Sequence, residues 1–173
     1  MLVRIRSLLR PLLMLLLFAS SLIIVQRSDA LAYTAEARNY NTSLNYCVKT
    51  KGTVEDLPVS QGTSKAESWG YLYQVYGQTT TCTSPYNEWA RIGVEIAVLQ
   101  SDTLSGGGYW RECATITGSK WNGASTNYVF LTRYNLPSGC SVTRGWFRTR
   151  SKSWFRDTGV SATVITNPVW LSP

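Results

Sequence analysis

The chain has 173 residues with 17 Lys and Arg, ten Asp and Glu and no His, so its formal net charge is +7 at pH 7. Because no imidazole is available, Ser-His-Asp and Cys-His catalysis and most catalytic metal sites are excluded. Residues 1–32 hold four of the basic residues and one of the acidic ones, which leaves +4 for the remainder. A net charge of this size does not indicate a nucleic-acid-binding protein, and we expect no nucleic acid partner.

The first 32 residues have the layout of a secretory signal peptide. Three arginines form a positively charged start, an apolar run extends from Pro11 to Val25, and Ala30-Leu31-Ala32 provides a small-x-small cleavage site. We therefore predict cleavage before Tyr33 and a secreted, extracellular protein. A leader retained as an anchor is the alternative, although the apolar run is shorter than the ~20 residues that a membrane-spanning helix needs. After cleavage we expect no integral membrane segment.

The remaining residues are enough for one domain with a sizeable core. Residues 33–43 are polar and are expected to form a loose N-terminal arm. Residues 44–173 are expected to form a single β domain.

Four cysteines in an exported chain predict two disulfides. We favour sequential pairing, Cys47 with Cys82 and Cys113 with Cys140, over the two other connectivities. Each bridge closes a loop of about 30 residues and would stabilise the fold by about 3 kcal/mol. Their wide spacing, without a Cys-x-x-Cys pair or any His, disfavours a structural zinc site. We expect no metal and no cofactor.

The clearest strand runs from Ala90 to Leu99, where large aliphatic residues alternate with other residues at a period of two. A Gly-rich segment, Ser101–Gly108, follows it and is typical of a flexible hairpin loop. A long polar loop is expected from Gly52 to Glu67. Further strands are expected over residues 44–50, 69–76, 109–117, 127–134, 140–150 and 159–166. The spacing predicts an all-β fold, an antiparallel β-sandwich or flattened barrel of about seven to eight strands.

The segment from residue 144 to residue 156 concentrates basic and aromatic residues at even-numbered positions. If the segment is extended, these residues share one face of a strand. A turn at Arg150–Ser153 would instead fold the two halves together. A row of cations flanked by Trp is a candidate surface for anionic groups, whereas the alternative is a solvated strand edge that discourages aggregation. The candidate ligand-binding residues are Trp146, Arg148, Arg150, Lys152, Trp154 and Arg156.

A second candidate binding surface is the aromatic row of Trp69, Tyr71 and Tyr73, which fall on one face of an expected strand. Exposed rows of this kind stack on sugar rings, because a flat apolar ring meets the C–H groups of the sugar. The alternative is that the row is part of the core, where large aromatic side chains contribute most to burial. Gly70 on the opposite face indicates that another chain segment approaches closely there.

Two carboxylates, Glu95 and Glu112, lie on strands that are expected to pair as a hairpin. A pair of carboxylates a few ångströms apart is the arrangement that glycoside hydrolysis needs. The alternative is that they form cross-strand ion pairs with Arg91 and Arg111.

Three functional hypotheses follow. The first is a secreted, non-catalytic binding module for an anionic or sugar-rich extracellular surface, such as an anionic glycan, a cell-wall polymer or membrane-surface headgroups. The second is a secreted toxin, bacteriocin or protease-inhibitor-like protein that acts through an exposed loop such as Ser101–Gly108. The third is a small glycan hydrolase that uses Glu95 and Glu112.

Overall fold

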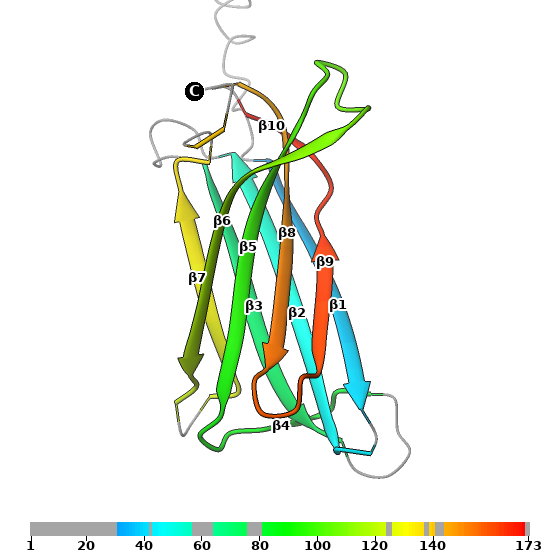
Figure 1. Ribbon diagram of the computed structural model, residues 1–173, viewed down its shortest axis with the longest axis vertical. Coiled ribbons are helices and arrows are strands. Elements are labelled where there is room, and N and C mark those ends of the chain that lie inside the picture. The colour runs from blue at the N-terminus through cyan, green and yellow to red at the C-terminus, as the bar shows by residue number, and fades with distance from the viewer. Residues whose placement is uncertain are drawn as a thin grey trace, which may run out of the picture.

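The computed structural model describes residues 31–41, 43–56, 64–75, 81–123, 126–136, 139–140 and 144–171. In these ranges ten strands form two antiparallel five-stranded sheets that pack face to face (Figure 1). The predicted all-β sandwich is therefore confirmed, with more strands than the sequence indicated. The expected signal peptide lies outside the described residues except for Leu31 and Ala32, which begin the first strand.

The first sheet is built around β3, which pairs with β2 on one side and with β4 and β7 on the other. Its strands are β1 (Leu31–Asn41), β2 (Tyr46–Asp56), β3 (Lys65–Gln74), β4 (Ser84–Pro85) and β7 (Tyr128–Tyr134). The second sheet is built around the pair β5 and β8. Its strands are β5 (Arg91–Ser101), β6 (Trp110–Trp121), β8 (Gly145–Phe155), β9 (Ser161–Ile165) and β10 (Val169–Leu171).

The N-terminal segment corrects one expectation, because most of the segment expected as a loose arm is strand β1. This strand pairs with β2 over its whole length, from Leu31 opposite Asp56 to Asn41 opposite Tyr46. Its polar composition reflects its place at the edge of a sheet, where alternate side chains face solvent. The side-chain amide of Asn39 also donates a hydrogen bond to the Ser161 carbonyl at 2.8 Å, which ties β1 to the second sheet.

The long polar loop expected over residues 52–67 is shorter than the sequence indicated. Strand β2 continues to Asp56 and β3 begins at Lys65, so both strands extend into the expected loop. The sequence shows no clear hydrophobic alternation here, because inward positions are occupied by small residues such as Gly52 and Ala66.

The core consists of two apolar clusters between the sheets. One contains Val48, Leu72, Ile92, Val94 and Phe155 with their neighbours. The other contains Val54, Ile96, Leu136, Phe147 and Leu171 with theirs.

Small residues line the inner faces of β2, β3 and β8 where the two sheets approach each other closely. A Cβ atom at Gly52 would lie 2.5 Å from Ser151 Oγ, and a Cβ at Gly70 would lie 2.9 Å from Ser153 Oγ. Ser153 Oγ also donates a hydrogen bond of 2.8 Å to Thr50 Oγ1 across the interface. These five residues, the small-residue belt, leave no room for large side chains between the sheets. The close approach predicted from Gly70 is confirmed.

We expect Gly52→Ala to destabilise the fold by about 1–3 kcal/mol, because the added methyl group overlaps the Ser151 hydroxyl. The measurement is the free energy of unfolding from denaturant titration. Gly107→Ala is the matched control, since its Cβ would meet nothing closer than Ser105 Oγ at 3.9 Å. Combining Gly52→Ala with Ser151→Gly should recover part of the loss, and additive losses would contradict the proposed overlap.

Two disulfides hold the described chain, and both match the favoured connectivity. Cys47 on β2 is bonded to Cys82, and Cys113 on β6 is bonded to Cys140. Their sequence separations are 35 and 27 residues. Bridges of this kind are compatible with an extracellular protein.

Reduction should lower the melting temperature by roughly 10 °C for each bridge, because each closed loop restricts the unfolded chain. The measurement is thermal unfolding by circular dichroism with and without a reductant. Cys47→Ala with Cys82→Ala, and separately Cys113→Ala with Cys140→Ala, divides the effect between the bridges. An unchanged melting temperature after complete reduction would contradict a structural role.

Candidate functional site

The main candidate site is a cluster of aromatic side chains on the outer face of the first sheet. We call it the aromatic platform. Its rings come from β3 and from the neighbouring β7, whose register places Phe130 opposite Trp69 and Tyr128 opposite Tyr71. The members are Trp69, Tyr71, Tyr73, Tyr128 and Phe130.

The rings of the platform form one continuous array. Along β3, the ring centroid of Tyr71 lies 6.3 Å from that of Trp69 and 6.5 Å from that of Tyr73, with interplanar angles of 15° and 29°. Across the strands, Trp69 lies 4.6 Å from Phe130, and Tyr71 lies 5.7 Å from Tyr128. Three phenol hydroxyls therefore accompany a connected apolar surface.

The platform faces outward because small residues occupy the inward positions of β3. Ala66, Ser68 and Gly70 are buried in the sandwich, and the residues between them are partly exposed. On β7, Phe130 is 44% exposed. The alternative that this row is core is therefore wrong, and the outward-facing alternative holds.

Polar groups surround the platform on two sides. Trp69 Nε1 donates a hydrogen bond to Glu67 at 3.4 Å, and Lys49 Nζ lies 5.4 Å from the Tyr71 ring centroid. Burial among its neighbours raises the pKa of the Tyr71 phenol, so this hydroxyl is a neutral donor at physiological pH. The side of the platform toward β1 carries Arg38 and Lys51 as well as Lys49.

The basic segment forms the single strand β8. The alternative with a turn at Arg150–Ser153 is therefore wrong, and the extended alternative is confirmed. Its odd-numbered residues are buried, and its even-numbered residues are partly or fully exposed on the outer face of the second sheet. Arg156 follows the strand and is exposed. The aromatic platform and the β8 segment thus lie on opposite faces of the sandwich, and they cannot form one surface.

Most members of the β8 segment already have partners within the protein. The Arg148 guanidinium stacks on Trp110 at 4.2 Å, and burial lowers its pKa. The indole of Trp146 donates a hydrogen bond to the Leu104 carbonyl at 2.8 Å. Trp154 lies across Gly93, where an added Cβ would come within 1.9 Å of its ring. Lys152 is exposed and lies 5.9 Å from the Trp154 ring centroid.

The two carboxylates considered for catalysis converge on one arginine. Arg150 Nη2 lies 2.9 Å from Glu112 Oε2 and 3.3 Å from Glu95 Oε1. This arrangement agrees with the ion-pair alternative, except that the partner is Arg150 on β8 and not Arg91 or Arg111. The guanidinium occupies the space between the carboxylates that a glycosidic bond would need.

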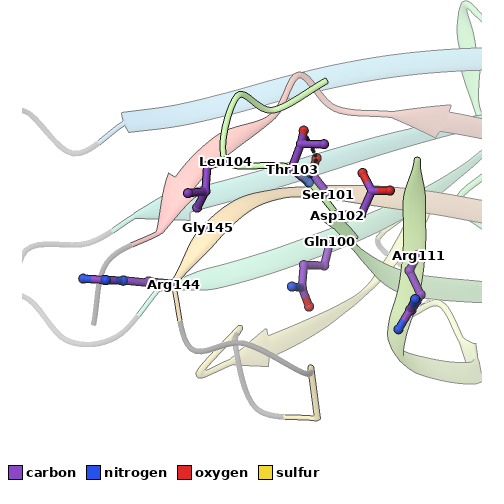
Figure 2. Close-up of a pocket in the computed structure, with 8 residues that line it drawn as sticks. All are labelled: Gln100, Ser101, Asp102, Thr103, Leu104, Arg111, Arg144 and Gly145. Atoms are coloured by element: carbon purple, nitrogen blue, oxygen red, sulfur yellow. Dashed lines mark hydrogen bonds between the residues drawn. The ribbon is translucent and has the colours of Figure 1, made fainter. Parts of the chain in front are cut away.

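A pocket of about 240 Å³ lies where the β5–β6 loop meets the start of β8. Figure 2 shows Arg111 and Arg144 on opposite sides of Gln100 with their side chains directed apart. The two cations therefore do not converge on a common anion. The lining residues are Gln100, Ser101, Asp102, Thr103, Leu104, Arg111, Arg144 and Gly145.

Within the described ranges, no group of three or more His, Cys, Asp or Glu is placed to hold a metal ion. The described residues also contain no helix with the length and apolarity to cross a membrane.

Sequence reasoning missed part of the aromatic platform and its basic side. Tyr128 and Phe130 alternate on β7, but their contacts with Tyr71 and Trp69 on β3 join residues that are 57 and 61 positions apart, and no local pattern predicts them. Arg38 was missed because its segment was interpreted as a loose arm.

Comparison with known proteins gives no family to guide the function. No family model matches the chain, and no curated protein is similar to it in sequence. The functional argument therefore rests on the geometry.

Proposed function

We propose that the chain is a secreted, non-catalytic binding module that attaches to a sugar-rich extracellular surface through the aromatic platform. The observation that carries the proposal is the continuous array of five outward-facing rings on β3 and β7. Contiguous exposed apolar surface of this kind marks an interaction site in a folded domain.

The chemistry of the platform suits sugars better than a purely apolar partner. Aromatic rings contact the C–H faces of sugar rings, and the hydroxyls of Tyr71, Tyr73 and Tyr128 are available to hydrogen-bond sugar hydroxyls. The rings stand on strands of a disulfide-linked sheet, so little conformational entropy is lost when a ligand binds. A long polysaccharide would extend along the row from Trp69 to Tyr73.

Secretion is supported by the signal-peptide pattern of the sequence and by two disulfides. The non-catalytic assignment is supported by the absence of His from the sequence and by the ion pairs of Glu95 and Glu112 with Arg150. In the β8 segment, Arg148, Arg150 and Trp146 hold neighbouring strands and loops. We therefore leave that segment out of the proposed binding surface, although Lys152 and Arg156 form no ion pair with a carboxylate among the described residues.

Trp69→Ala and Tyr71→Ala should each weaken binding to a sugar-rich polymer at least about tenfold, the scale expected for a central aromatic residue of an interface. The measurement is a pull-down of the oxidised protein on insoluble polysaccharides and cell-wall preparations, in low salt and in 1 M salt. Aromatic contacts resist salt, so the binding that remains in 1 M salt should disappear in both variants.

Trp121→Ala is the matched control, because this residue is 57% exposed at the edge of the other sheet. It should bind like the wild type, and unchanged melting temperatures should verify folding in all three variants. If the platform variants bind every polymer as well as the control does, the platform is not the binding site and the proposed function is wrong.

A second candidate function, a protease-inhibitor-like interaction protein, is favoured by the β5–β6 loop. This loop projects beyond the end of the sandwich (Figure 1, light green) and carries Leu104 at 79% exposure and Tyr109 at 73% exposure. It was expected to be flexible, yet it is held internally, with Ser101 Oγ donating to the Gly107 carbonyl at 2.7 Å. Trp146 packs on Gly106 and fixes the tip to β8. A rigid loop with exposed apolar side chains is suited to binding a protein cleft.

If this second function holds, the wild type should inhibit a member of a panel of secreted proteases, and Leu104→Asp should raise its inhibition constant at least about tenfold. Thr117→Ala, on the outer face of β6, is the control. The polysaccharide binding of Leu104→Asp should be unchanged. Full activity of every protease in the presence of the wild type would remove this candidate.

A further inference from the structure

The outer face of the first sheet carries a row of cations directly beside the aromatic platform. We propose, building on the function proposed above, that the polysaccharide is a polyuronate and that its carboxylates bind this row. The row, which we call the cationic border, consists of Arg38 on β1 and Lys49 and Lys51 on β2.

The register of the sheet sets the cations and rings side by side. Arg38 pairs with Lys49, which in turn pairs with Tyr71 on β3. Lys51 pairs with Trp69 in the same way. Because directly opposite residues share a face and lie about 5 Å apart, one row runs from Arg38 through Lys49 to Tyr71. The next row runs from Glu36 through Lys51 to Trp69. A sugar ring stacked on Tyr71 would thus place its substituents beside the border.

The border retains like charges at positions where a sheet disfavours them. Arg38 and Lys49 are direct cross-strand partners, and like charges in this arrangement are destabilising. Lys49 is compensated by Glu36, whose Oε2 lies 2.9 Å from its Nζ. Among the described residues, neither Arg38 nor Lys51 forms an ion pair with a carboxylate. The three cations and Glu36 together carry a charge of +2, which two carboxylates of a polyanionic ligand would neutralise.

A pocket between the border and the platform offers a place for the anion. It has a volume of about 360 Å³, and its lining includes Arg38, Lys49 and Tyr73. Glu36 also lines it, with its carboxylate in an ion pair with Lys49. Both the Cys47–Cys82 bridge and strand β1 contribute to its wall. A pocket of this size accommodates one sugar unit, and the planar guanidinium of Arg38 matches a carboxylate with two parallel hydrogen bonds.

The basic residues of β8 provide an internal comparison. There, Arg150 is bound to Glu95 and Glu112, so its charge is already compensated. The border has the opposite balance, since it has more cations than carboxylates and lies against partly exposed rings. An acidic sugar polymer supplies both a carboxylate and a ring, and it is the ligand class that satisfies both features at once.

The test compares binding to polygalacturonate, alginate and hyaluronan with binding to their fully methyl-esterified forms, which keep the sugar backbone but carry no charge. Dextran sulfate, which carries sulfate groups and no carboxylate, distinguishes sulfate from carboxylate as the recognised group. We expect at least one polyuronate to bind, and esterification to weaken its binding about five- to tenfold. Arg38→Gln with Lys51→Gln should cause a loss of the same size and reduce the salt dependence.

Lys152→Gln with Arg156→Gln, on the opposite face, is the matched control and should leave binding unchanged. If the platform variants lose binding while esterification and the border variant have no effect, the proposed function stands and the polyuronate inference is wrong. If dextran sulfate alone among the charged polymers depends on the border, the inference is likewise overturned. If the wild type binds no polysaccharide, or if Trp69→Ala changes nothing, both proposals fail.

Discussion

The close approach of the two sheets at the small-residue belt is the constraint on which the rest of the structure depends. Gly52 and Gly70 lie so near Ser151 and Ser153 that even one additional methyl group would overlap a hydroxyl. The belt separates the two apolar clusters of the core and fixes the distance between the sheets there. At the level of the belt, large side chains on these strands can therefore occupy only the outer faces, whereas Leu72, Phe147 and Phe155 fill the core on either side of it.

This constraint explains why an aromatic platform exists at all. Strand β3 buries Ala66, Ser68 and Gly70, and period-two alternation then forces Trp69 and Tyr71 outward. Five rings that would stabilise a core are instead held on the surface by strands of a sheet that is cross-linked through Cys47 and Cys82. Because the backbone beneath them is fixed, the rings keep their mutual spacing without a bound ligand.

The fold was largely predictable from the sequence, and the candidate site only in part. Alternation at Ala90–Leu99 and the even number of cysteines predicted the sandwich and its bridges, because both signals are local or countable. The residue type of Trp69 alone does not predict whether its side chain faces the core or the solvent, because aromatic residues suit a core equally well. The informative signal was the smallness of the intervening residues, above all Gly70. The pairings of β3 with β7 and of β1 with β2 depend on tertiary contacts that no local pattern specifies.

Whether the charge of a basic side chain on this protein is compensated depends on the residues of the neighbouring strands. Arg150 and Arg38 are the same residue type on outward strand positions, yet Arg150 meets two carboxylates and Arg38 meets Lys49. The segment with the most basic residues, β8, thus mainly links strands and loops of the second sheet. The sparser cations beside the platform have charge left uncompensated. Like charges on cross-strand partners lower stability, and Glu36 compensates only Lys49 of the pair Arg38 and Lys49. This remaining charge next to partly exposed rings is the basis of the anionic partner proposed above.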